Sequence, residues 1–188
     1  PLKACDPYLR FVFLTGITKF SQLSIFSELN NIKNISMLPE YGSICGITEE
    51  EMREQMGEGI DRLAGNLGVT PEEALEVLKQ NYDGYHFTWP SPDIYNPFSL
   101  LNALADSKLN SYWFGSGTPT YLIEMLNKYH VKPQQIGARK VLAESFDAPT
   151  ERMVDITPLL YQSGYITIKD YSSLTNLYTL DIPNKEVR

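Results

Sequence analysis

The feature that most constrains this chain lies near its start, where Phe11-Val12-Phe13-Leu14 runs directly into Thr15 and Gly16. A short, uninterrupted apolar run that ends in turn residues is typical of a strand buried on both faces inside a parallel α/β sheet. Such a strand needs neighbours on both sides, yet only ten residues precede it. We identify no second parallel strand with a crossover helix after it. The run therefore predicts that the chain begins within a larger domain.

The composition suits one globular domain, because 43% of the 188 residues are hydrophobic and 21% are charged. The formal net charge of -7 disfavours a basic face that grips nucleic acid, so we do not expect direct DNA binding by this segment. Cys5 and Cys45 form no CxxC pair, which favours reduced thiols in a cytoplasmic protein. No apolar run reaches the length of a transmembrane helix, so no membrane contact is expected.

The first long helix is predicted from Thr48 to Leu67. Thr48 and Glu51 form a capping box, and apolar residues recur at helical spacing up to Leu67. Glycines weaken its middle, and Gly68 is a typical C-terminal stop. A shorter helix is expected over residues 24–30.

Four dipeptides place a capping side chain directly before proline, which indicates a helix start at each because proline loses no hydrogen bond there. The four are Thr70-Pro71, Asn96-Pro97, Thr118-Pro119 and Thr157-Pro158.

The last segment changes to the alternating pattern of strands. Residues 165–171 and 177–182 alternate around a turn of about five residues, which predicts a β-hairpin. A short helix from Pro158 to Gly164 precedes it, and together they have the outline of a winged helix. The predicted fold class is therefore α+β and mainly helical, with one core strand, a helical lid and this winged-helix-like end.

Few residues suggest chemistry by themselves. The segment Gly16–Ser21 lacks the second glycine and the Gly-Lys-Ser/Thr end of a P-loop. Tyr82-Asp83-Gly84-Tyr85 reads as a tight turn, although Asp83 with nearby His86 has the groups for acid–base work. Gly115–Pro119 leads into a helix and has the form either of a plain cap or of an anion-binding loop. We find no metal-ligand spacing.

Several short motifs occur in order along nearly the whole chain, at Phe13–Ser21, Ser24–Ser27, Tyr82–Tyr85, Tyr95–Ser99, Tyr112–Phe114, Gly117–Pro119, Gln162–Tyr165 and Pro183–Val187. Together they resemble the predicted AAA-ATPase-like family of anaerobic bacteria. Complete members resemble P-loop ATPases with Walker A and Walker B motifs upstream of this segment. Many continue into a nuclease-like domain of the PD-(D/E)xK type. This chain lacks the Walker motifs and the nuclease carboxylates, so the resemblance implies that it is inactive alone.

The resemblance implies three regions. Residues 1–34 would end the P-loop core, residues 35–156 would form the helical lid, and residues 157–188 would form the winged-helix-like end. ATP and Mg²⁺ would be the cofactors of the complete protein. Its partners would be the upstream core, a downstream nuclease-like domain and a protein partner.

By family position, Thr15, Thr18 and Lys19 are sensor candidates near the γ-phosphate. Gly117, Thr118 and Pro119 resemble the Gly-x-Pro element that approaches the nucleotide from the lid. The Tyr82–Tyr85 turn is a family signature to which we assign no role at this point.

Two other functions stay open at this point. The acidic, tyrosine-rich composition also suits a non-catalytic module that binds a protein partner. The third hypothesis is that this chain is a nucleic-acid-associated segment of an ATPase–nuclease protein.

Overall fold

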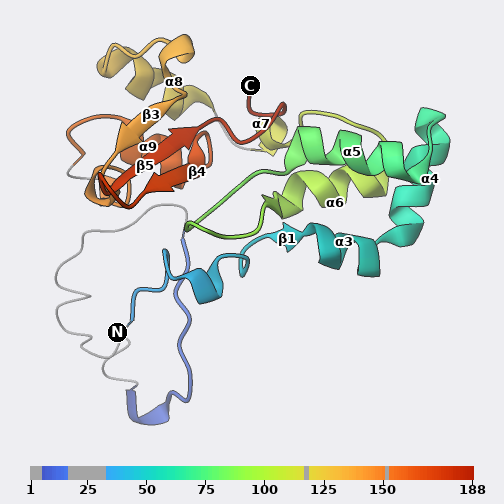
Figure 1. The fold of residues 1–188 in the computed structure, drawn as a ribbon, viewed down its shortest axis with the longest axis horizontal. Coiled ribbons are helices and arrows are strands. Elements are labelled where there is room, and N and C mark those ends of the chain that lie inside the picture. The colour runs from blue at the N-terminus through green and yellow to red at the C-terminus, as the bar shows by residue number, and fades with distance from the viewer. Residues whose placement is uncertain (1–5, 17–32, 117–118, 151–152) are drawn as a thin grey trace.

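A computed structural model describes residues 6–16, 33–116, 119–150 and 153–188, which build two lobes joined side by side (Figure 1). The first lobe is helical, and the second holds a small sheet with two helices. The first contains β1 (Ile47–Thr48), α3 (Glu49–Gln55), α4 (Gly57–Leu67), α5 (Pro71–Tyr82), β2 (Ile94–Tyr95) and α6 (Pro97–Asp106). The second contains α8 (Pro119–Lys128), β3 (Arg139–Val141), α9 (Thr157–Gln162), β4 (Thr167–Ser172) and β5 (Leu177–Asp181). Between the lobes lies α7 (Tyr112–Ser116), and short 3-10 turns occur at Asp6–Tyr8, Pro39–Tyr41, Pro133–Gln135 and Ala143–Ser145. The predicted class, α+β and mainly helical, is confirmed.

The helical lobe begins its helices where the capping residues predict. Thr48 and Thr70 each accept a hydrogen bond from the backbone N–H three residues on and complete a capping box with Glu51 and Glu73. The side chain of Asn96 accepts from the first turn of α6 in the same way. The helices then bury one continuous apolar core, whose members include Met52, Leu63, Leu78, Tyr95, Leu100 and Ala103.

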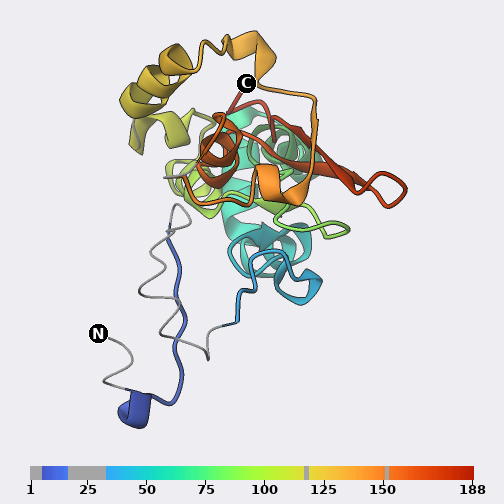
Figure 2. The same cartoon turned by 90° about the vertical axis from the view of Figure 1, so that its left-hand side faces the viewer.

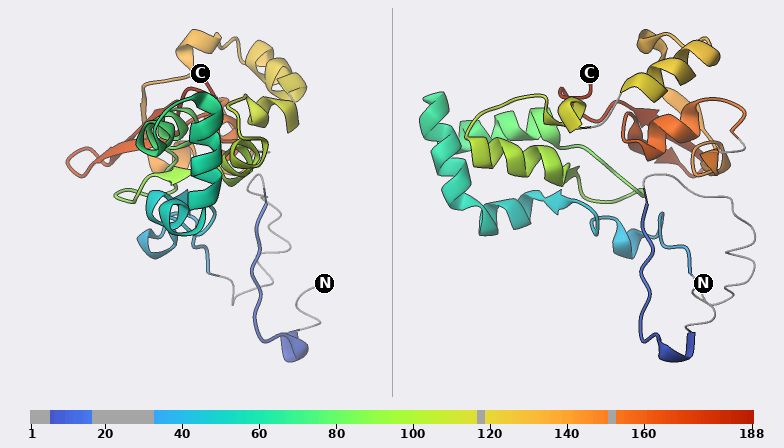
Figure 3. Two further views of the ribbon diagram at one scale, coloured as in Figure 1. Left: turned by 90° about the vertical axis from the view of Figure 1, so that its right-hand side faces the viewer. Right: turned by 180° about the vertical axis from the view of Figure 1, so that it is seen from behind.

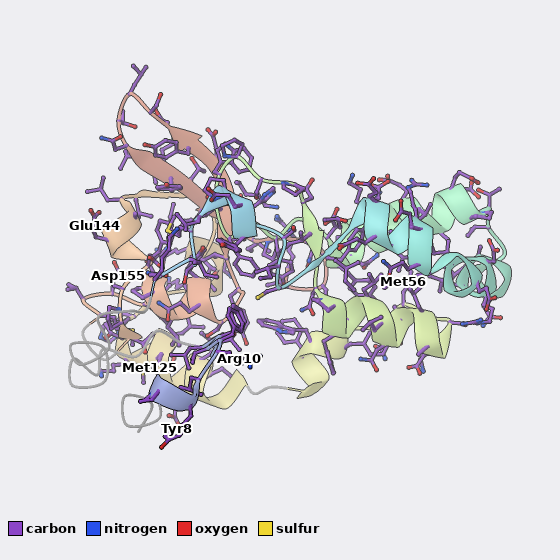
Figure 4. The ribbon with its side chains drawn as sticks, turned by 90° about the horizontal axis from the view of Figure 1, so that it is seen from below. Tyr8, Arg10, Met56, Met125, Glu144 and Asp155 are labelled. Carbon is purple, nitrogen blue, oxygen red and sulfur yellow. The ribbon has the colours of Figure 1, made fainter. Side chains whose placement is uncertain are left out.

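The predicted helix over residues 48–67 is two helices. The chain breaks at Met56, which has φ −122° and ψ 19° and separates α3 from α4 (Figure 4). Gly59 lies after the break and faces Leu104 of α6, where an added Cβ would come within 3.3 Å of the leucine side chain. The glycines thus let α4 turn and approach α6 closely. Gly68 ends α4 in the left-handed conformation, as predicted.

The second lobe is built on an antiparallel sheet of order β3-β5-β4. The predicted hairpin is present as β4 and β5, and its turn projects from the body of the molecule (Figures 2 and 3). The third strand, β3, pairs with β5 and was not predicted, because three residues carry too little pattern. Helices α8 and α9 bury Leu122, Leu159 and Leu160 in the core of this lobe, together with Phe146. The predicted boundary between residues 156 and 157 runs through this core.

Helix α9 starts differently from the prediction. Thr157 is its first residue and not its cap, because Asp155 accepts the backbone N–H of Thr157 at 2.6 Å. The Thr157 hydroxyl instead accepts from the Arg139 guanidinium at 2.9 Å, which ties α9 to β3. Pro119 does start α8, while Thr118 lies outside the described residues.

The predicted core strand at residues 11–14 is not formed. This segment has no strand pairing and extends away from both lobes, with Phe11 82% exposed (Figures 1 and 3). A strand exists only when its backbone N–H and C=O groups pair with a neighbour, and no described part of the chain provides one here. The predicted helix over residues 24–30 lies outside the described residues.

A third apolar cluster joins the two lobes. Tyr85, Ile94 and Val187 are buried in it, and Trp113 and Tyr165 pack around them. The cluster therefore combines a turn of the helical lobe, a short strand, the C-terminal end and α7.

Candidate functional site at the lobe junction

The Tyr82–Tyr85 motif lies at the junction and begins with the last residue of α5. The Tyr82 ring is buried, and its hydroxyl donates to the Asn110 carbonyl at 2.8 Å and accepts the Asn110 N–H at 3.0 Å. Its carbonyl accepts the backbone N–H of Asn96 at 2.9 Å. Tyr82 thus fixes the end of α5 against the starts of α6 and α7.

Asp83 follows and is buried, with 3% of its surface exposed. Its carbonyl accepts from the Asn184 side chain at 2.9 Å. Burial raises the pKa of the Asp83 carboxyl to about 6, and the backbone hydrogen bond from Gly84 only partly opposes this. The neighbouring Asp93 carboxylate raises the pKa further, and Lys79 lowers it. A carboxyl in this state changes its charge close to neutral pH.

Gly84 lies where the backbones of the two lobes come close together. It has φ +90°, and a Cβ there would lie 2.7 Å from the Pro183 carbonyl oxygen and 2.8 Å from the Lys169 ammonium. Lys169, on β4, donates to the carbonyls of both Gly84 and Pro183. Only glycine combines this backbone conformation with this contact. Burial lowers the pKa of Lys169, although Asp93, Asp83 and Asp181 oppose that change.

The chain then pairs with both lobes in succession. Tyr85 exchanges two backbone hydrogen bonds with Ile94, each 3.2 Å long. His86 donates its backbone N–H to the Thr167 hydroxyl at 2.8 Å, and that hydroxyl donates to the His86 carbonyl at 2.9 Å. Gly84 and His86, two residues apart, therefore fasten the helical lobe to β4.

A Ser–His–Asp arrangement lies directly after the turn and was missed from sequence. The imidazole of His86 has Ser91 Oγ at 2.9 Å from Nδ1 and Asp93 Oδ1 at 2.8 Å from Nε2. Burial lowers the pKa of His86, which favours the neutral ring. The Trp89 ring packs edge-on against it at 4.9 Å. All these residues belong to one loop, and Ser91 Oγ also lies within hydrogen-bond distance of the Thr88 carbonyl, so the arrangement fixes the conformation of this loop.

Several other polar atoms are buried at or near this junction. Within the described residues, Asp83 Oδ1, Tyr95 OH, Ser99 Oγ and Glu186 Oε2 have no hydrogen-bond partner. A buried polar group without a partner lowers stability, so these atoms mark polar positions inside the packed junction. These groups belong to the sequence motifs around Tyr82, Tyr95 and Pro183, which the fold brings together from distant parts of the chain.

The other predicted site residues lie elsewhere. Thr15 is exposed at the end of the extended N-terminal segment. Thr18, Lys19, Gly117 and Thr118 lie outside the described residues, and Pro119 is the first residue of α8.

The described ranges contain no group of three or more His, Cys, Asp or Glu side chains placed to hold a metal ion. None of their helices is long and apolar enough to cross a bilayer.

Sequence reasoning missed Lys169, Asn184 and Glu186 as parts of the junction. Lys169 lies in an alternating hairpin, where a lysine normally points to water. The Pro183–Val187 motif was the one sequence feature that pointed to this region, because it follows the hairpin and matches no helix or strand pattern.

Comparison with known proteins gives one distant relative. An uncharacterized protein in the vnfD 5′ region of Azotobacter chroococcum mcd 1 is 31% identical over 195 residues. The match includes the whole of this chain but 34% of the relative, so the chain spans about a third of that protein's length. No protein-family model matches the chain, and no solved structure matches it.

The contact at Gly84 generates the first prediction. Gly84→Ala forces a side chain into a positive-φ position and against Pro183, so the free energy of unfolding should fall by at least about 1–3 kcal/mol. Gly65→Ala is the matched control, because nothing lies within 4 Å of that Cβ and the substitution should stabilise α4 by roughly 0.5–1 kcal/mol. Denaturant unfolding measures both, and equal effects of the two variants would refute the close contact.

Burial of Asp83 generates a pH prediction. Because its folded-state pKa of about 6 lies above the ordinary value of 3.8, the folded chain binds this proton more tightly than the unfolded chain. This group therefore makes the free energy of unfolding fall as pH rises between about 4 and 6. In Asp83→Asn that contribution should vanish, whereas Asp61→Asn on the exposed face of α4 should keep it. Urea titrations across this range test the difference, and parallel pH profiles for wild type and Asp83→Asn would contradict it.

Proposed function

We propose that this chain is the sensor and lid part of an AAA-type ATPase, which closes over ATP bound by an upstream P-loop core and transmits the nucleotide state. The observation that carries the proposal is the exposed run at residues 11–14. Four apolar side chains, each at least 39% exposed, lie in an extended segment that pairs with no strand in the described part of the chain. An edge of a parallel sheet would bury these side chains and pair their backbone.

The order of the motifs supports this assignment. The extended segment includes Thr15, where the resemblance begins the sensor residues Thr15, Thr18 and Lys19. Helix α8 begins at Pro119, where it places the Gly117-Thr118-Pro119 element. A helix followed by a hairpin, as in α9, β4 and β5, is the outline that supports a winged-helix-like end. The length of the Azotobacter relative leaves room for an upstream core and a downstream nuclease-like domain.

The nucleotide and its Mg²⁺ fit the described residues only in part. The described residues hold no carboxylate cluster for the metal, and Gly16 lies in an exposed, extended segment. The proposal therefore assigns phosphate and metal binding to the upstream core. This chain contributes the residues that contact the nucleotide from the sensor strand and the lid.

Binding of a protein partner is the second candidate function. The exposed side chains of Phe11 and Phe13 favour it, because they would also suit strand addition to another protein. This function needs no nucleotide, which separates it from the first.

Phe11→Ala tests whether the exposed run packs on a core. In the 188-residue chain the substitution should change the free energy of unfolding by less than about 0.5 kcal/mol, because the side chain is exposed. In the complete gene product it should cost about 3–5 kcal/mol, as for a buried phenylalanine. Leu174→Ala, at a hairpin position 95% exposed, is the control that should be neutral in both. A neutral Phe11→Ala in the complete product would contradict the proposal.

The sensor assignment gives an activity prediction. In the complete gene product, Thr15→Ala, Thr18→Ala and Lys19→Ala should include at least one variant whose kcat for ATP hydrolysis falls on the order of 100-fold, as when one charge-stabilising donor is lost. Thr175→Ala, in the exposed turn of the hairpin, should leave kcat unchanged. Unchanged kcat in all three sensor variants would remove these residues from the nucleotide site.

A further inference from the structure

The residues that follow β5 form a strap across the end of helix α5. In this strap, residues 182–187, Lys185 donates its backbone N–H to the Gln80 carbonyl at 3.0 Å and Glu186 donates to the Asn81 carbonyl at 3.3 Å. Carbonyls in the last turn of a helix have no partner within the helix. The strap therefore supplies the donors that complete the C-terminal end of α5.

The Glu186 side chain connects the strap to α7. Its Oε1 accepts the backbone N–H of Trp113 at 3.0 Å, and the residue is 6% exposed. Trp113 lies in the first turn of α7, the short helix that leads directly to Gly117-Thr118-Pro119. One buried carboxylate thus joins the segment before α8 to the end of α5.

Apolar contacts hold α7 on its other side. The Trp113 ring packs edge-on against Tyr165 at 4.7 Å and lies next to Gly164, in the turn after α9. Val187 is buried against Tyr85 and Ile94 in the cluster that joins the lobes. Helix α7 is therefore held between the strap and the turn after α9, and any shift of α7 changes contacts with both lobes.

We propose that the strap is the coupling element of the lid and that Glu186 is its positioning residue. Movement of α7 is transmitted through Glu186 to the strap, and from there to the end of α5 and to the Tyr82–Tyr85 turn. Asn184 completes the path, because its side chain donates to the Asp83 carbonyl and accepts the Val187 N–H at 3.2 Å. The inference rests on the proposed function for the signal, which is nucleotide contact by the segment after α7.

Amide hydrogen exchange in the 188-residue chain tests the link without nucleotide. In Glu186→Ala the Trp113 amide loses its acceptor and should exchange at least about tenfold faster. The amides of residues 185 and 186, which donate to carbonyls of α5, should exchange faster with it, because the strap loses its link to α7. Glu186→Gln keeps the acceptor oxygen and should stay close to wild type. The amide of Leu63, in the core of α4, is the internal control. Faster exchange at Trp113 alone would overturn the proposal.

A second variant, Val187→Ala, changes the C-terminal end of the strap. It leaves the Glu186 carboxylate in place but removes part of the apolar packing between Val187 and the cluster of Tyr85 and Ile94. Because coupling is reciprocal, it should also accelerate exchange at Trp113. Faster exchange in the strap with an unchanged Trp113 amide would show that strap and helix move independently, which overturns the proposal even if Glu186→Ala does not fold.

Exchange in the complete gene product, with and without Mg-ATP, separates this inference from the proposed function. If both hold, nucleotide changes the protection of Trp113, Lys185 and Glu186 together, and Val187→Ala weakens the response in α5. If nucleotide protects the sensor segment but not the strap, the coupling fails and the ATPase assignment stands. If nucleotide changes neither while the variants behave as expected, the ATPase assignment fails and the strap remains a structural link only.

Discussion

The contact between Gly84 and the C-terminal segment is the constraint on which the two-lobed structure depends. At this point the backbone of the helical lobe meets the Pro183 carbonyl, and one half-buried lysine, Lys169, binds carbonyls from both segments. Two carbonyls that approach each other would repel, and the ammonium between them removes that repulsion. Lys169 and Gly84 are 85 residues apart in the sequence, so the hydrogen bond between them fixes the tertiary arrangement and not a local turn.

Local physics made much of the fold predictable from sequence. The capping boxes at Thr48 and Thr70 and the turn between β4 and β5 depend on residues within a few positions of one another, so their patterns are sufficient. Thr157 shows the limit, because its hydroxyl accepts from the distant Arg139 guanidinium instead of capping α9. The run at residues 11–14 shows another limit: burial of a strand depends on a partner strand, and sequence pattern alone does not say which chain segment supplies it.

The candidate site was predictable only as a set of motifs. Sequence reasoning singled out Tyr82–Tyr85 and the Pro183–Val187 motif separately, and it gave neither a role. Their connection depends on the Asn184 and Glu186 side chains, whose partners are distant in sequence. Asp83 is held at the junction by its backbone, while its buried carboxyl keeps a pKa of about 6.

The proposed lid function requires that this chain bind nucleotide only together with a P-loop core, and thermal unfolding with and without Mg-ATP tests this most directly. Ligand at about 100 times its dissociation constant stabilises a protein by about 2.7 kcal/mol, which corresponds to a rise in Tm of several degrees for a domain of this size. The account predicts this rise for the complete gene product and no change in Tm for the 188-residue chain. A rise in the chain alone would contradict it, because a complete nucleotide site would then lie within these residues.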